Sequence, residues 1–190
     1  MRILFLIAAL LLLSACQGTA FEKPPLADSP CDVRLAGHWE SVGDRTEENG
    51  EVQLDISDSC NLAVSERKQG KIIEGEPTRL HVGQLGAWWY LWVDAEWSRK
   101  RFDTGLPVRP GDVYLMRYEL RKGELVLNMP DDKLIAHRII DGDIPGQVSK
   151  DDQNLQNRIT GGPHPRLLDS PGFFSKESMR FRRGKGSAQP

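Results

Sequence analysis

Residues 88–97 hold the densest group of side chains able to stack against a ligand, including four of the five tryptophans. Read as a β-strand, this segment points successive side chains to opposite faces. One face is apolar throughout and is the expected core face: Trp89, Leu91, Val93, Ala95 and Trp97. The other face is aromatic at its start and acidic at its end, and it is the candidate binding surface: Trp88, Tyr90, Trp92, Asp94 and Glu96.

Three interpretations of the candidate surface stay open at this point. Its aromatic rings can form the centre of an interface with a protein or an envelope polymer, or stack against a small sugar or apolar ligand. Alternatively, the C-terminal part of the chain packs over the rings as a second core layer. Asp94 and Glu96 have a spacing that can serve acid–base catalysis. Such pairs are common on sheet surfaces, so we expect a non-catalytic protein.

Other polar residues match no catalytic template. The chain has no Gly-x-Ser-x-Gly and no His-Glu-x-x-His motif, and its four histidines lack metal-ligand spacing. We therefore predict neither a metal nor a cofactor. The basic run Arg99-Lys100-Arg101 is expected to pair with nearby acidic side chains, or else to dock an acidic partner.

The N-terminus indicates export. Ile3 to Leu13 is an apolar run of 11 residues after Arg2, too short for a membrane-spanning helix of about 20 residues and typical of a signal peptide. It ends in Leu13-Ser14-Ala15-Cys16, which resembles the lipobox of bacterial lipoproteins. The resemblance implies that residues 1–15 are removed and that Cys16 is lipidated, the alternative being an ordinary signal peptide. Gln17 slightly favours the outer membrane in that family.

The mature chain is expected to hold one domain. Loss of 15 residues from 190 leaves 175, and loss of Arg2 leaves 24 basic against 27 acidic side chains, a net charge of −3. No field strong enough to attract nucleic acid follows from this charge. The proline-rich residues 16–32 are expected to form a tether, residues 33–183 the domain, and residues 184–190 a disordered tail.

Two cysteines remain besides Cys16. Cys31 and Cys60 form an even pair in an oxidising compartment, where disulfides persist. We predict a bridge between them that contributes about 3–4 kcal/mol by the chain-entropy model. The alternative is a pair of free buried thiols.

Alternating apolar residues predict an all-β fold. Strands are expected at residues 51–56, 60–64, 78–82, 88–97, 112–120, 124–129, 134–140 and 179–182, with a short helix near 163–168. Leu35-Ala36-Gly37-His38-Trp39 is similar to the start of the first strand in lipocalin-like proteins. This resemblance implies an antiparallel lipocalin-like (calycin-type) barrel of about eight strands, followed by a short C-terminal helical segment.

Together these patterns indicate a lipid-anchored lipoprotein of the bacterial cell envelope, in the outer membrane and facing the periplasm. We expect it to bind a protein or an envelope component through its β domain, as assembly factors, inhibitors and immunity proteins do. The alternative is a lipocalin-like carrier of a small apolar ligand, which requires an open cavity.

Overall fold

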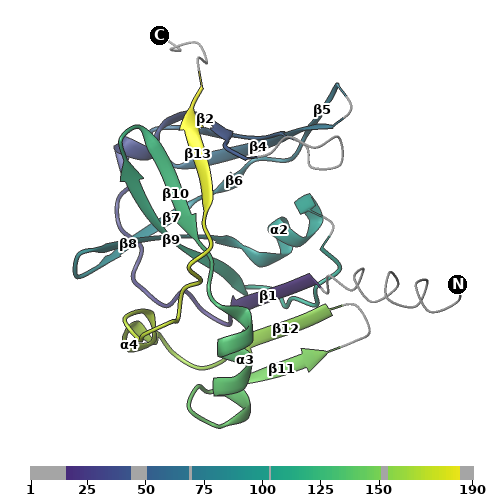
Figure 1. Ribbon diagram of the computed structural model, residues 1–190, viewed down its shortest axis with the longest axis vertical. Coiled ribbons are helices and arrows are strands. Elements are labelled where there is room, and N and C mark those ends of the chain that lie inside the picture. Colours follow the sequence, from purple (N-terminus) through teal and green to yellow (C-terminus); the bar gives the residue numbers. More distant parts are fainter. Residues whose placement is uncertain (1–15, 44–50, 69, 103, 151–153, 185–190) are drawn as a thin grey trace, which may run out of the picture.

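The computed structural model describes residues 16–43, 51–68, 70–102, 104–150 and 154–184, and these are predominantly β (Figure 1). The strands are β1 (Cys16–Phe21), β2 (Gly37–Ser41), β3 (Glu51–Ile56), β4 (Asn61–Lys68), β5 (Lys71–Glu74), β6 (Thr78–Arg79), β7 (His81–Leu85), β8 (Trp88–Asp94), β9 (Val113–Arg121), β10 (Glu124–Asn128), β11 (Gly146–Lys150), β12 (Asn154–Ile159) and β13 (Met179–Arg183). The helices are a 3-10 turn η1 (Val33–Leu35), α2 (Ala95–Phe102), α3 (Asp132–Ile140) and α4 (Pro165–Leu168). The expected signal peptide, with Leu13 to Ala15, and residues 185–190 lie outside the described ranges.

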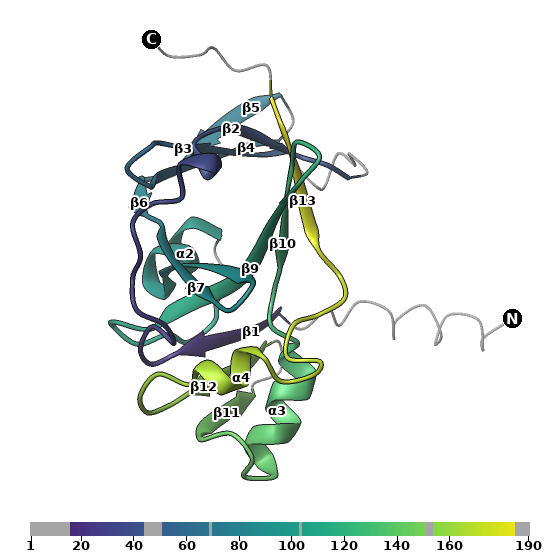
Figure 2. The ribbon, with the colours of Figure 1, turned by 90° about the vertical axis from the view of Figure 1, so that its left-hand side faces the viewer.

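All 13 strands belong to one sheet, whose main path runs β11-β12-β1-β9-β10-β13-β2-β3-β4-β5. Strand β8 pairs with β9 and β7, and β6 pairs with β4. The sheet is not closed into a barrel, so the expected eight-stranded lipocalin-like barrel is not confirmed. The sheet branches at β9, because β1 pairs with its start at residues 113–114 while β10 pairs with residues 117–121. Figure 2 shows α3, α4, β11 and β12 gathered on one side of β1.

The expected tether is wrong. Residues 16–21 form β1, which pairs residue for residue with β12 in parallel and with the start of β9. Thr19 and Ala20 are buried, and a bridge between Ser29 and Val82 holds the following segment against β7. The prolines at residues 24 and 25 favour a spacer when the sequence is read alone. In the structure, β1 lies between β12 and β9 and joins them in the sheet.

Two expected strand segments are helical instead. Residues 134–140 lie in α3, where the Asp131 carboxylate accepts the backbone N–H of Leu134 at 3.0 Å and caps the helix. Residues 95–97 lie in α2, because Asp94 accepts the backbone N–H of Trp97 at 2.7 Å and ends β8. A capping carboxylate therefore overrides the apolar alternation at both places. The short helix near 163–168 and the last strand near 179 are confirmed.

Strand β8 forms the wall between two hydrophobic clusters. The inner cluster holds Leu91, Val93 and Ala95 together with Trp39 and Tyr118, so the expected core face of this segment is confirmed. The outer cluster holds the buried aromatics of the other β8 face and side chains from β1, β9, β12, α3, α4, the segment after α3 and the C-terminal segment: Phe21, Tyr90, Trp92, Val113, Leu115, Ile135, Ile144, Ile159, Leu168, Phe173 and Phe174.

The predicted disulfide between Cys31 and Cys60 is present. It joins two residues 29 positions apart whose Cα atoms are separated by 5.6 Å. It links the segment before β2 to the turn between β3 and β4, and Cys60 is buried in the inner cluster.

Within the described part of the chain, no helix has the length and apolar character needed to cross a membrane.

Candidate binding site

The structure splits the predicted binding surface. Trp88, Tyr90, Trp92 and Asp94 share the outer face of β8, whereas Glu96 lies in α2. Tyr90 and Trp92 are almost completely buried, at 0% and 1% exposure. The ring of Phe174 lies 5.8 Å from that of Tyr90, so the C-terminal segment covers this part of the face. The interpretation of a second core layer is therefore confirmed for the middle of the face.

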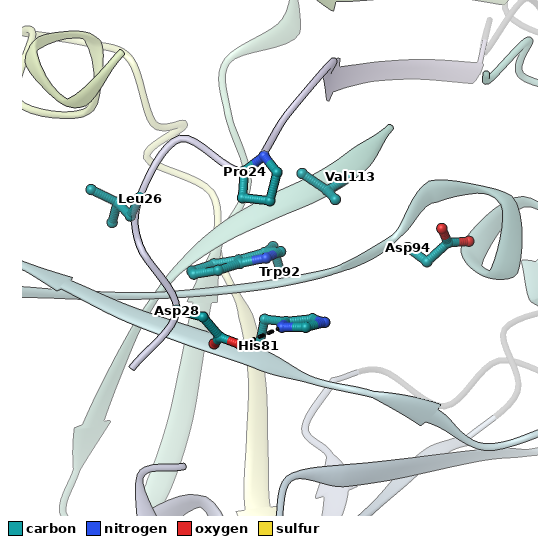
Figure 3. A pocket seen from close by; sticks show the side chains of 7 residues that line it. All are labelled: Pro24, Leu26, Asp28, His81, Trp92, Asp94 and Val113. Carbon is teal, nitrogen blue, oxygen red and sulfur yellow. Dashed lines mark hydrogen bonds and ion pairs between the residues drawn. The ribbon is translucent and has the colours of Figure 1, made fainter. Parts of the chain in front are cut away.

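At the α2 end of the face, Trp92 borders a small pocket of about 290 Å³ (Figure 3). The imidazole of His81 stacks on Trp92, with ring centroids 5.8 Å apart and planes 9° from parallel. Its Nδ1 lies 2.8 Å from the carboxylate of Asp28. The pocket is lined by Pro24, Leu26, Asp28, His81, Trp92, Asp94 and Val113.

The expected carboxylate pair does not form on a strand face. Asp94 caps α2, and Glu96 lies in the first turn of that helix. In Figure 3 the Asp94 carboxylate points away from His81 and Asp28. Over the described ranges, no three His, Cys, Asp or Glu side chains gather in a way that could hold a metal ion.

At the other end of the face, Trp88 is 38% exposed and borders a larger hollow of about 620 Å³. Arg117, on β9, lies between two aromatic rings, with its Cζ 4.4 Å from the ring centroid of Trp88 and 4.9 Å from that of Phe174. Such contacts hold a guanidinium in place through the negative faces of the rings. The hollow is lined by Trp88, Arg117, Asp131 and residues 168–177. We call it the Trp88–Arg117 pocket.

Two buried polar atoms near this pocket have no hydrogen-bond partner among the described residues: Nε of Arg117 and the hydroxyl of Tyr90. The two residues are direct neighbours across β8 and β9, which places their side chains on the same face. Burial, and then the charge of Asp169, raise the pKa of Tyr90 to about 12, against the opposing charge of Arg117. A buried donor left without an acceptor costs about 1–3 kcal/mol. The site therefore retains donor capacity that the described part of the chain does not use.

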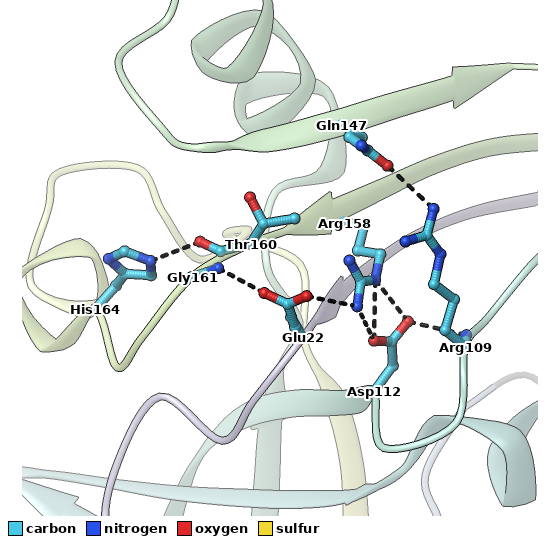
Figure 4. A network of polar contacts seen from close by, with 8 residues as sticks. All are labelled: Glu22, Arg109, Asp112, Gln147, Arg158, Thr160, Gly161 and His164. Atoms are coloured by element: carbon cyan, nitrogen blue, oxygen red, sulfur yellow. Dashed lines mark hydrogen bonds and ion pairs between the residues drawn. The ribbon is translucent and has the colours of Figure 1, made fainter.

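A separate polar network fixes the strands beneath the outer cluster (Figure 4). Arg158 on β12 donates to both oxygens of Asp112 at 3.0 and 3.1 Å and to Glu22 at 3.2 Å. Glu22 also accepts the backbone N–H of Gly161 at 2.7 Å, and this bond, followed by Arg158, lowers the pKa of its carboxyl. Glu22 directly follows β1 and Asp112 directly precedes β9, so these bonds join β1 and β12 to the start of β9 and the network has a structural role.

Sequence reasoning missed Arg117 as a site residue. A visible signal existed: it is the cationic residue that follows Val113 and Leu115 on the same face of β9. Its aromatic partner Phe174 lies 57 positions further along the chain, in an irregular segment that no periodicity places.

No family model, no curated protein and no solved structure matches this chain.

Proposed function

We propose that this chain is a bacterial cell-envelope lipoprotein, anchored by a lipid on Cys16, that binds a partner protein without catalysis through the Trp88–Arg117 pocket. One observation carries the proposed binding site: Arg117 lines the pocket with its guanidinium held between the rings of Trp88 and Phe174. The anchor rests on the lipobox resemblance. The Cys31–Cys60 bridge supports an oxidising compartment such as the periplasm.

The chemistry of the pocket narrows the partner. A guanidinium held in one orientation favours a carboxylate, which it can bind with two hydrogen bonds. Exposed Trp88 adds a flat apolar surface, and tryptophan and arginine are enriched among residues that dominate binding energy. Asp131, Asp169 and Glu177 also border the pocket and oppose a second negative charge. The fitting ligand is a protein segment with one carboxylate, flanked by an apolar side chain and by hydrogen-bond donors.

A carrier of a small apolar ligand would instead need a cavity within the inner cluster. The two hollows described above lie on the outer face of β8, outside that cluster. Trp39 and Tyr118 are buried inside it. These observations favour the protein-binding proposal over the carrier.

The test is photo-crosslinking in cells. A photoreactive phenylalanine analogue replaces exposed Lys176, which lines the pocket, and adducts are compared in two backgrounds. Arg117→Met keeps a side chain between the rings but removes the donors, and it should abolish the adduct. Loss of a desolvated charge pair costs about 2–5 kcal/mol, which is tenfold or more in affinity.

Arg121→Met is the matched control. Arg121 lies on the same strand, is exposed, and pairs with Glu119 away from the pocket lining, so this variant should retain the adduct. An adduct of equal yield in both backgrounds, or none from residue 176 in the unmodified background, would contradict the proposed site. Circular dichroism of both variants confirms that each is folded.

A further inference from the structure

We infer that the surface formed by the last turn of α2 and by β5 lies against the membrane that holds the lipid of Cys16, and that it contacts anionic headgroups. This inference rests on the lipid anchor of the proposed function. Its first support is the absence of a spacer. Cys16 is the first residue of β1, and pairing with β12 begins at Cys16 itself, opposite Asn154.

Only a short distance along the chain separates Cys16 from the buried part of the fold. Thr19 and Ala20 are already buried, three and four residues after Cys16. A strand advances about 3.3 Å per residue, so the compact body begins roughly 10–13 Å from the anchored residue. An anchored Cys16 therefore holds this side of the domain at the membrane surface rather than at the end of a flexible linker.

The segment after α2 packs directly on β1. A Cβ placed on Gly18 would meet the side chain of Leu106 at 2.8 Å, so the loop that leaves α2 lies against the third residue of the strand. Figure 1 shows the start of β1, helix α2 and strand β5 on the same side of the molecule. The anchored residue, the helix and this edge strand thus face one direction.

The side chains on this surface suit a headgroup region. Arg99, Lys100 and Arg101 form the basic last turn of α2, which ends at Phe102 with 46% exposure. Ile72 and Ile73 on β5 are 56% and 47% exposed. Basic side chains combined with exposed aromatic and aliphatic ones are typical of surfaces that lie in an anionic membrane interface. The net negative charge of the chain does not prevent this surface from binding anionic headgroups, because salt screens the repulsion from acidic side chains that lie beyond a Debye length of about 8–10 Å.

Arg101 joins the two halves of the surface. Its Nη2 donates to the backbone oxygen of Ile73 at 3.1 Å, and its Nε donates to that of Val64 at 3.2 Å. The helix and β5 are therefore fixed to one another. Exposed Phe102 and Ile73 flank this link, and both can enter the interface without rearrangement of the fold.

The test uses the full lipidated protein in vesicles of phosphatidylethanolamine and phosphatidylglycerol. Phe102→Cys is labelled with an environment-sensitive fluorophore under non-reducing conditions, so that the Cys31–Cys60 bridge stays intact. We expect a blue-shifted emission that lipids with spin labels near the headgroup quench. Substitution of Arg99 and Lys100 by Glu in the same labelled protein should weaken the quenching. In vesicles of phosphatidylcholine alone, the same substitutions should change it little.

Val33→Cys provides the matched control. Val33 is 70% exposed in η1, and its neighbour Arg34 stacks on Trp89 at the start of β8, whereas α2 follows the end of β8. The label at residue 33 should stay unshifted and unquenched. Equal signals at the two positions would overturn the inference while the anchor stands. The mass of the N-terminal peptide reports the anchor separately, and an unacylated Cys16 would overturn both.

Discussion

The inner face of β8 carries one aromatic and two aliphatic side chains, the outer face carries three aromatic side chains and Asp94, and the two faces are covered in different ways. Neighbouring strands with the same alternation of apolar residues cover the inner face. Strands β1 and β12, helices α3 and α4 and an irregular C-terminal segment together cover the outer face. The difference is visible at the edge of the outer face, where Trp88, Arg117 and residues 168–177 line a hollow. Buried hydroxyls do not separate the faces: Tyr118, inside, donates to Asp32 at 2.7 Å, whereas Tyr114, inside, and Tyr90, outside, have no described partner. A regular sheet completes one core, and an irregular cover leaves a pocket at the edge of the other.

The two ends of the outer face should respond very differently to the same substitution. Trp92→Ala removes a side chain with 1% exposure and should lower the free energy of unfolding by about 3–5 kcal/mol. Trp88→Ala removes a side chain with 38% exposure and should cost about 1 kcal/mol or less. Denaturant unfolding of both variants measures the difference. Equal losses would mean that the C-terminal segment covers both ends alike.

The disulfide should stabilise the inner cluster in particular. Replacement of Cys31 and Cys60 by Ser opens a loop of 29 residues and should lower the free energy of unfolding by about 3–4 kcal/mol. Since the bridge lies in the inner cluster, its loss should leave binding at the Trp88–Arg117 pocket unchanged under conditions where the variant is folded. A loss of binding in the folded double variant would show that the two faces are coupled.

The sequence predicted the inner face well and the outer face poorly, for a physical reason. Alternation at period two fixes which side chains of a strand share a face, so Leu91 and Val93 were placed correctly, whereas Ala95 reaches the inner cluster from α2. What covers the opposite face depends on contacts across 50 or more positions, as between Trp88 and the pocket-lining residues 168–177. The polar strand β12 and the short β1 carry no alternation, so the extension of the sheet beyond an eight-stranded barrel was missed.

Two of the three buried tyrosines, Tyr118 in the inner cluster and Tyr90 in the outer cluster, offer a finer comparison of the faces. Tyr118→Phe removes a hydrogen bond to the carboxylate of Asp32 and should cost about 1–3 kcal/mol. Tyr90→Phe removes a buried hydroxyl that has no described partner and should leave stability unchanged or raise it by up to about 1 kcal/mol. Unfolding measurements on the two variants provide the check. A clear loss for Tyr90→Phe would reveal a partner of that hydroxyl in the free protein.

The smallest expected effect depends on pH and concerns Asp132, at the start of α3. Burial raises the pKa of its carboxyl, and the charge of Asp131 adds to this, although Thr19 donates a hydrogen bond to it at 2.6 Å. The folded state therefore holds this proton more tightly than the unfolded chain, so stability from this group falls as pH rises through the raised pKa.

Asp132→Asn mimics the protonated form of this carboxyl and can still accept a hydrogen bond from Thr19. It should stabilise the protein at neutral pH, and the gain should vanish below the ordinary pKa of an aspartate. Asp131→Asn, which keeps the cap of α3, should change stability little at either pH. A loss of stability for Asp132→Asn at neutral pH would mean that the favourable charge at the helix N-terminus outweighs burial.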